Sequence, residues 1–103
     1  MDFDFYQSQA MTTRLPTACT DYALFNLAGE VGELTSLYAK GIRDGKKLDF
    51  LDNAKKEMGD ILWSLAALAN DWGLSLSDVA GTNLEKLASR QQRNVLEGSG
   101  DNR

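Results

Sequence analysis

The sequence predicts an all-α fold, in which three main helices form an antiparallel bundle, a short N-terminal helix precedes them and oligomerisation completes the structure. Apolar residues recur at helical spacing through three long stretches of the chain, which is the pattern of amphipathic helices. The only proline, Pro16, interrupts the pattern before the first long stretch. Because 103 residues bury only a modest core, association with another copy would add to the buried apolar surface.

The ends of the predicted helices carry local signals. Thr20 is a candidate N-cap for the first long helix, and Asp49 is a candidate N-cap for the second. Ser75 and Asp78 have the spacing of a capping box at the start of the third. The short helix and the three long helices are therefore expected at residues 2–12, 20–43, 49–72 and 75–95.

The first two long helices each carry an apolar stripe. On the first helix, the stripe consists of Leu24, Leu27, Val31, Leu34, Tyr38 and Ile42. On the second helix, it consists of Leu51, Ala54, Met58, Ile61, Leu65, Ala69 and Trp72. The aromatic residues expected in the core are Phe25, Tyr38, Trp63 and Trp72.

Composition and charge exclude several classes of protein. The net charge of −4 argues against a nucleic-acid partner, which normally needs a basic face. No apolar run reaches the length of a membrane span, and the acidic N-terminus lacks the pattern of a signal peptide. The single cysteine, Cys19, fits a reducing compartment. We therefore expect a cytoplasmic protein with no membrane partner, one helical domain over residues 1–97 and a disordered tail over residues 98–103.

Four acidic residues form two pairs, each with a spacing of three. Glu30 and Glu33 lie in the first long helix, and Glu57 and Asp60 lie in the second. Glu33 and Glu57 are each twelve residues from Gly45, whereas Glu30 and Asp60 are each fifteen residues from it. If the two helices fold back as an antiparallel hairpin, all four carboxylates reach one level. Four like charges at one level repel one another unless a cation lies among them.

The absence of histidine narrows the choice of cation. With no histidine and one cysteine, a metal ion here must be held by oxygen atoms. Oxygen ligands suit magnesium, manganese or calcium rather than zinc. The spacing of the acids favours metal binding and a salt-bridged core about equally, since structural ion networks use similar residues.

A polar stripe on the last helix contains Asn83, Lys86 and Arg90. Basic residues near the end of a helix are common because they interact favourably with its dipole. Beside an acidic metal site, the same residues would suit the other side of a polyphosphate. If this helix packs antiparallel to the preceding one, Arg90 comes within about a turn of Asp60. Tyr6 fits either the core or a stacking contact with a base.

Three segments together resemble the MazG-like nucleotide pyrophosphohydrolases of the all-α NTP pyrophosphatase superfamily. They are LAGEVGEL, then KKEMGDILWSLAALA about two dozen residues later, and then NLEKLASR. The resemblance covers about residues 22–90 and is weaker before Pro16. The two acidic motifs in apolar helices, followed by NLEKL, are more specific together than any one motif alone.

The resemblance implies an activity, a cofactor and an assembly. The activity is hydrolysis of a nucleoside triphosphate, (d)NTP, to the nucleoside monophosphate and pyrophosphate, usually to remove damaged or surplus nucleotides. The implied ligands of Mg2+, with Mn2+ as a possible substitute, are Glu30, Glu33, Glu57 and Asp60. The implied phosphate-binding residues are Asn83, Lys86 and Arg90. Base preference would depend on the N-terminal region, with Tyr6, and on residues around Lys40. Family members assemble as homodimers or homotetramers, in which helices of paired subunits form a bundle around the sites.

Two assignments stay open at this point. Either Glu33 or Glu30 would orient or deprotonate the attacking water. The alternatives in function are a phosphoribosyl-ATP pyrophosphohydrolase, from the same superfamily, and a non-catalytic helical module that keeps the acids for a structural metal or a partner.

Overall fold

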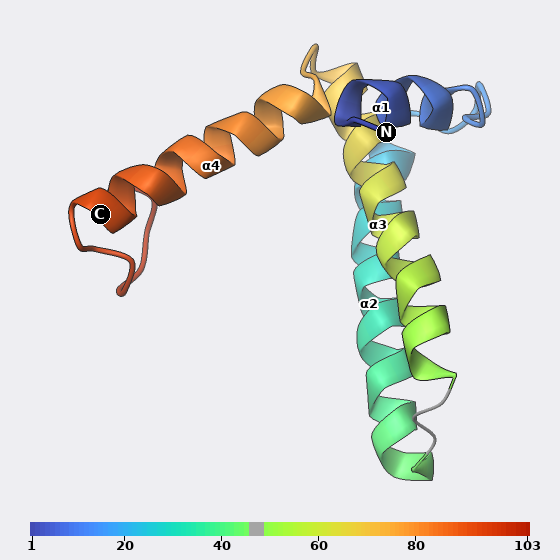
Figure 1. The fold of residues 1–103 in the computed structure, drawn as a ribbon. Coiled ribbons are helices and arrows are strands. Elements are labelled where there is room, and N and C mark those ends of the chain that lie inside the picture. The colour runs from blue at the N-terminus through green and yellow to red at the C-terminus, as the bar shows by residue number, and fades with distance from the viewer. Residues whose placement is uncertain (46–48) are drawn as a thin grey trace.

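A computed structural model describes residues 1–45 and 49–103 and contains four helices. They are α1 (Phe3–Met11), α2 (Thr20–Asp44), α3 (Phe50–Asp71) and α4 (Leu76–Gln92). Figure 1 shows α2 and α3 side by side as a long antiparallel hairpin, with α1 across the end opposite its tip. The predicted all-α class and the α2–α3 hairpin are confirmed, and the described residues form no strand. Among these residues, every helix is too short or too polar to cross a lipid bilayer.

The seam between α2 and α3 contains both apolar and acidic side chains. On α2, the buried and half-buried positions are Ala23, Asn26, Leu27, Glu30, Leu34, Leu37 and Gly41. On α3, the buried and half-buried positions nearest α2 are Phe50, Ala54, Glu57, Ile61, Ser64 and Leu68. Their spacing of three and four residues is that of two helices packed along a shared line. The seam therefore includes one glutamate from each helix at positions that usually hold apolar residues.

Most of the predicted apolar stripe lies outside this seam. Exposed fractions of 41 to 75% are found for Leu24, Val31, Tyr38 and Ile42 on α2 and for Leu51, Met58, Leu65 and Trp72 on α3. The prediction of a core position was also wrong for Phe25, which is exposed, whereas Trp63 packs against both core clusters. The physical reason is that the hairpin closes on the neighbouring face, so that a second apolar face stays uncovered in the single chain.

The core lies where α1, α3 and α4 meet and continues between α2 and α3, and it consists largely of alanine. Its two clusters are Ala10, Ala66, Ala69 and Leu76, and Ala23, Ala67 and Leu68. Small side chains let the helices approach closely, but they bury little apolar area each. The indole of Trp63 packs between the clusters and donates a hydrogen bond to the carbonyl of Ala10 and another to the hydroxyl of Thr13.

The connection between α1 and α2 is tied to the end of α3. Arg14 donates two hydrogen bonds of 2.7 Å to the carboxylate of Asp71, and Thr20 donates another of 2.7 Å to the same group. The prediction that Thr20 caps α2 is therefore wrong, because its hydroxyl is used by Asp71 and Cys19 takes the N-cap position. Asp49 does hold the N-cap position of α3, although its side chain accepts no capping hydrogen bond.

The turn between α3 and α4 sets the direction of the last helix. Gly73 has the left-handed backbone (φ 70°), and the amide of Leu74 donates to the carbonyl of Ala69 in the manner of a Schellman motif. Ser75 then caps α4 by accepting from the amide of Asp78, as the sequence predicted.

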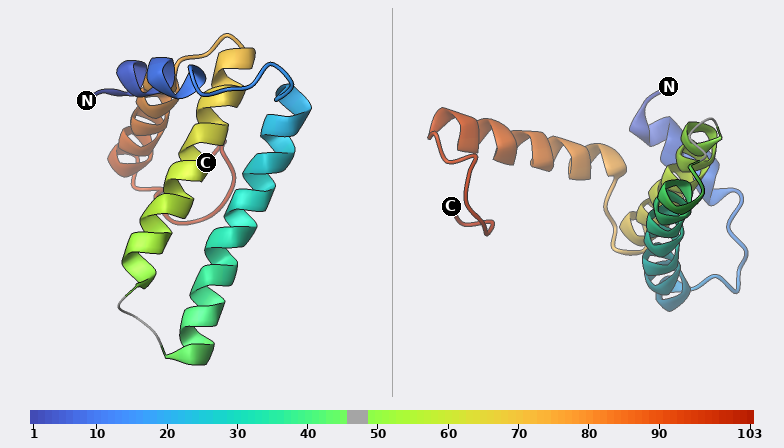
Figure 2. Two further views of the ribbon diagram at one scale, coloured as in Figure 1. Left: turned by 90° about the vertical axis from the view of Figure 1, so that its right-hand side faces the viewer. Right: turned by 90° about the horizontal axis from the view of Figure 1, so that it is seen from below.

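α4 projects away from the hairpin, as the views in Figures 1 and 2 agree. It contacts α1 and α3, and no contact between α4 and α2 occurs in the described part of the chain. The antiparallel packing that would bring Arg90 close to Asp60 is therefore absent within one chain.

Candidate functional site

Three of the four predicted acids meet in the middle of the hairpin. Glu30 and Glu33 of α2 and Glu57 of α3 each offer one carboxylate oxygen, and these oxygens all lie within 4.8 Å of one another. Glu30 and Glu57 are half-buried, whereas Glu33 is exposed. We call these three residues the acidic cluster. It forms because helical spacing places Glu33 one turn beyond Glu30, while the hairpin brings Glu57 opposite them.

The fourth predicted acid, Asp60, lies outside this group of close oxygens. Its carboxylate is exposed, one turn further along α3 from Glu57. It is nevertheless near enough to act electrostatically, since its charge raises the pKa of Glu30. The pKa of Tyr6 is raised mainly by burial and secondly by the charge of Asp60, so α1 also borders this region.

The acidic cluster is electrostatically unfavourable in the chain alone. Burial raises the pKa of Glu30 above its usual range, and the charges of Asp60, Glu33 and Glu57 raise it further. One buried oxygen of Glu30 and one of Glu57 have no hydrogen-bond partner among the described residues. Buried polar atoms are rarely left without a partner, so two of them at one place suit a bound cation or a proton.

The donor set of the acidic cluster fits an oxygen-preferring divalent cation. All of its donors are carboxylate oxygens, as Mg2+ and Mn2+ prefer. Glu30 and Glu57 supply two oxygens that no other group in residues 1–45 and 49–103 binds, and exposed Glu33 lies beside them. The residues present therefore fit the metal that the sequence predicted.

A polar pair next to the acidic cluster has a supporting role that sequence analysis missed. The amide of Asn26 donates a hydrogen bond of 2.9 Å to the hydroxyl of Ser64, which is fully buried. Asn26 lies one turn before Glu30, and Ser64 lies one turn after Asp60. The bond thus joins α2 to α3 directly beside the acids. This hydrogen bond could have been predicted from the sequence, because both residues are small, polar and at positions that face the other helix.

The predicted phosphate-binding residues lie on α4, apart from the acidic cluster. Lys86 and Arg90 both form ion pairs with Asp101, at 3.0 and 3.1 Å. Asn83 is exposed one turn earlier on the same helix. No ion pair between α4 and the acids of the hairpin is found in the part of the chain that the structure describes. A single chain therefore does not bring the predicted metal ligands and phosphate ligands together.

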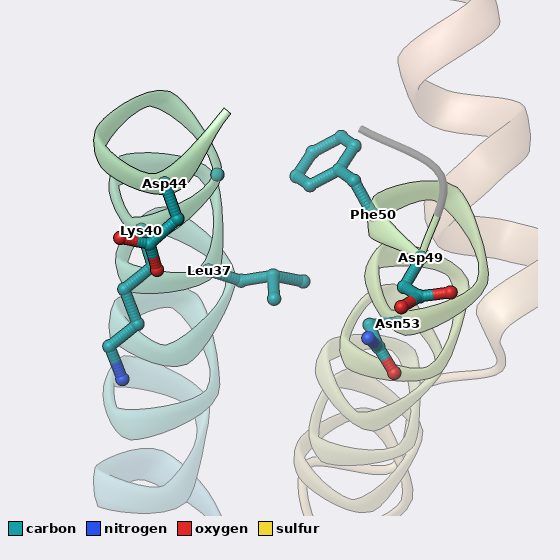
Figure 3. A pocket seen from close by; sticks show the side chains of 7 residues that line it. Leu37, Lys40, Asp44, Asp49, Phe50 and Asn53 are labelled. Carbon is teal, nitrogen blue, oxygen red and sulfur yellow. The ribbon is translucent and has the colours of Figure 1, made fainter. Parts of the chain in front are cut away.

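Lys40 lies at the edge of a shallow pocket near the tip of the hairpin. The pocket has a volume of about 200 Å³ and is lined by Leu37, Lys40, Gly41, Asp44, Asp49, Phe50 and Asn53. Figure 3 shows Leu37 and Phe50 reaching into the gap from α2 and α3, while Lys40 extends along the outer side of α2. Leu37 is one turn beyond Glu33, and Asn53 is one turn before Glu57. The pocket therefore adjoins the acidic cluster.

Comparison with known proteins identifies a family for most of the chain. Residues 21–95 match the family described as the MazG nucleotide pyrophosphohydrolase domain. The chain is also 37% identical to the "Gene 37 protein" of Mycobacterium phage L5, over 114 aligned positions that cover all of both chains. No solved structure shows a significant match. The matched region includes the acidic cluster, Asp60 and the whole of α4.

Proposed function

Because the chain belongs to the MazG nucleotide pyrophosphohydrolase family, we propose that it hydrolyses nucleoside triphosphates, (d)NTP, to nucleoside monophosphates and pyrophosphate in a Mg2+-dependent reaction. The main support for the proposal is the acidic cluster, in which one oxygen of Glu30 and one of Glu57 have no partner in the part of the chain that the structure describes. An apolar seam accepts buried carboxylates only when a cation or a proton offsets their charge. The biological role that follows is removal of damaged or surplus nucleotides.

All four acids are assigned to the metal, and one of them is also assigned to the attacking water. Glu30, Glu33, Glu57 and Asp60 would hold Mg2+, with Mn2+ as a possible substitute. When bound, the ion would offset the negative charge of the phosphates. Glu33 is the exposed member of the acidic cluster, which favours it over Glu30 as the residue that orients the attacking water and takes its proton.

The phosphate-binding residues would come from a second copy of the chain. α4 projects from the body of its own chain (Figure 1), and its Lys86 and Arg90 form no ion pair with the acids of the hairpin among the described residues. The uncovered apolar stripes on α2 and α3 repeat at heptad spacing, as in Leu51, Met58, Leu65 and Trp72. We infer a homodimer or homotetramer, in which the stripes pack together and α4 of one copy approaches the acidic cluster of another.

The nucleoside would bind next to the acidic cluster. Tyr6 borders Asp60 from the side of α1, and Lys40 borders the pocket at the tip of the hairpin. We assign both residues to substrate binding, with the choice of base set by one or both of these regions. Replacing each by alanine should change the ratio of kcat/KM values among nucleotides more than it changes the type of bond cleaved.

The substrate and the products test the proposed reaction. The purified chain is incubated with Mg2+ and a panel of (d)NTPs that includes modified bases and phosphoribosyl-ATP, and the products are separated by ion-exchange chromatography. The proposal expects a nucleoside monophosphate and pyrophosphate in equal amounts. Release of orthophosphate would contradict cleavage between the α and β phosphates. Preference for phosphoribosyl-ATP would favour the related pyrophosphohydrolase instead.

A non-catalytic module is the alternative from another class, and binding measurements separate it from an enzyme. Calorimetry with Mg2+ and a non-hydrolysable (d)NTP analogue gives both affinities without turnover. Binding of Mg2+ without binding of nucleotide would favour a structural or partner-binding role for the acidic cluster. Binding of both, with turnover of the hydrolysable nucleotide, supports the proposed enzyme.

A further inference from the structure

The tail turns back on α4 and covers the basic residues of its polar stripe. α4 ends at Gln92; two residues later Asn94 has the left-handed backbone (φ 58°), and the amide of Val95 donates to the carbonyl of Arg90. The guanidinium of Arg103 then closes the loop by donating to the carbonyls of Val95, Leu96 and Gly100. Figures 1 and 2 show this loop returning beside α4.

The loop places one carboxylate between two cations. The side chain of Asp101 accepts from Lys86 at 3.0 Å and from Arg90 at 3.1 Å, and Arg90 also donates to the carbonyl of Gly100. These interactions lower the pKa of Asp101, with the hydrogen bond from Lys86 as the largest cause. A carboxylate held by a lysine and an arginine occupies the position in which a phosphate oxygen would be bound.

A second observation indicates that Arg90 belongs to a ligand site. Its residue surface is only 6% exposed, yet its Nε atom has no hydrogen-bond partner among the described residues. Arginine is seldom buried without full pairing. A carboxylate at Asp101 meets one terminal nitrogen of Arg90, whereas a phosphate has more oxygens to offer to the guanidinium.

We propose that the tail is an internal competitor for phosphate, in which Asp101 occupies Lys86 and Arg90 until a polyphosphate displaces it. The proposal rests on the proposed function, since it names the regulation of the same site. Asp101 is eleven residues from Arg90 in sequence, so the tether keeps a weak ligand at a high effective concentration. Asp101 is itself 81% exposed, so its ion pairs are weak and the loop opens readily.

The expected size of the competition follows from the weakness of exposed ion pairs. Only molecules with the loop open can bind phosphate, so the apparent dissociation constant is the intrinsic one divided by the open fraction. Replacing Asp101→Asn removes the charge and keeps the shape of the side chain. It should tighten the binding of inorganic pyrophosphate by about two- to fivefold. If the enzyme is active, the KM for the nucleotide should fall by the same factor while kcat stays unchanged.

The matched control is Glu97→Gln, which removes one negative charge from an exposed neighbour without an ion pair in the described structure. Pyrophosphate binding to the full-length chain is measured by calorimetry without Mg2+, so the result does not depend on hydrolysis. The backbone amide resonances of Gly98 and Gly100 are followed during the same titration. The proposal expects them to shift in the wild type, and it expects the control to bind like the wild type.

Several outcomes would overturn the proposal. Two concern affinity: wild type and Asp101→Asn bind pyrophosphate equally well, or the Glu97→Gln control binds it as tightly as Asp101→Asn does. The other two are that the Gly98 and Gly100 resonances do not respond to bound pyrophosphate, and that no variant binds pyrophosphate. Tighter binding by Asp101→Asn in a chain that hydrolyses no nucleotide would support the competitor and refute the proposed function. If the wild type, Asp101→Asn and Glu97→Gln all hydrolyse nucleotide with the same KM, only the role of Asp101 as a competitor is refuted.

Discussion

Glu30 and Glu57 lie at seam positions of a helical hairpin, where apolar residues normally pack. Each has one buried carboxylate oxygen without a partner among the described residues, and the charges of Asp60, Glu33 and Glu57 raise the pKa of Glu30. Neither burial nor repulsion favours the folded chain. Residues that destabilise the fold at one place commonly serve function there. The cost at these positions is therefore the strongest single sign of a metal site.

The substitution Glu57→Gln tests whether Glu57 lowers stability in the metal-free protein and is needed for metal binding. The change removes one like charge from the seam, so the metal-free protein should gain about 1 kcal/mol in free energy of unfolding. It also removes one proposed ligand, so the stabilisation by Mg2+ should fall and kcat/KM should drop about 100-fold or more. Thermal unfolding with and without Mg2+ measures the first two effects.

The control for this change is Asp52→Asn, on the exposed side of the same helix. It should leave both the Mg2+-dependent shift and the activity close to those of the wild type. A Glu57→Gln protein that keeps the full Mg2+-dependent shift would refute the assignment of Glu57 as a ligand.

Asp71 is a second residue whose charge has a measurable consequence. Hydrogen bonds from Arg14 and then Thr20 lower its pKa from 3.8 to about 2, and its side chain is 18% exposed. Because the folded-state pKa is the lower one, ionised Asp71 stabilises the fold above about pH 4. This stabilisation is lost as the pH falls from about 4 to about 2.

The variant Asp71→Asn should therefore be less stable than the wild type at pH 7 and equally stable near pH 2. Urea unfolding at several pH values between 7 and 2 measures the difference. Asp44 and Asp101 also have lowered pKa values, so the comparison must be the difference between variant and wild type at each pH. A difference that does not change with pH would refute the role of the Asp71 charge.

At the scale of whole elements, a buried side chain of α1 helps to hold α4 in place. Gln7 donates to the carbonyls of Ala66 and Leu74, at 3.3 and 3.2 Å, and accepts from the amide of Leu76 at 2.9 Å. It thereby joins the helix before the hairpin, the end of α3 and the first turn of α4. An amide is suited to this position because it donates and accepts at once.

We predict that Gln7→Ala lowers the free energy of unfolding by about 2–3 kcal/mol, because it leaves buried backbone groups without partners. Gln9→Ala, an exposed change on the same helix, is the control and should cost little. Chemical denaturation measures both. The same loss in both variants would mean that α1 helicity, rather than the hydrogen bonds of Gln7, determines the result.

At the scale of the whole molecule, the single chain has an incomplete apolar core. Among the residues that the structure describes, eight hydrophobic residues are buried, and six of them are alanines. Meanwhile large apolar side chains are exposed at heptad spacing along both hairpin helices. Exposed apolar surface of this extent is typical of an interface, so we predict that copies of the chain associate through it.

The substitution Leu65→Glu on the α3 stripe tests the interface. A charge buried between copies should raise the dissociation constant of the oligomer by about 100-fold or more. Light scattering after size-exclusion chromatography gives the mass, and circular dichroism confirms that the helices persist. Leu15→Glu, in the exposed connection before α2, introduces the same charge outside the stripe and should leave the mass unchanged. A wild-type protein that is monomeric at high concentration would refute the oligomer.

Much of the fold and of the candidate site could be predicted from local sequence. Helical periodicity, the Ser75 cap and the turn at Gly73 are properties of neighbouring residues, so the four helices were expected within a few residues of their ends. The equal distances of Glu33 and Glu57 from Gly45 predicted their meeting, because the rise per residue is the same in both helices.

Only the tertiary structure decided how these elements are used. Whether the seam of the hairpin would run through Val31 or through Glu30 depended on packing between distant helices, which periodicity alone does not distinguish. The direction of α4 depended on the turn at Gly73 together with the hydrogen bonds of Gln7, and the contact of Asp101 with Arg90 depended on a loop that returns to its own helix. Sequence by itself determined the helices and their chemistry, because both are local. The tertiary structure decided which faces are buried and which charges are paired, because these depend on contacts between residues far apart in the chain.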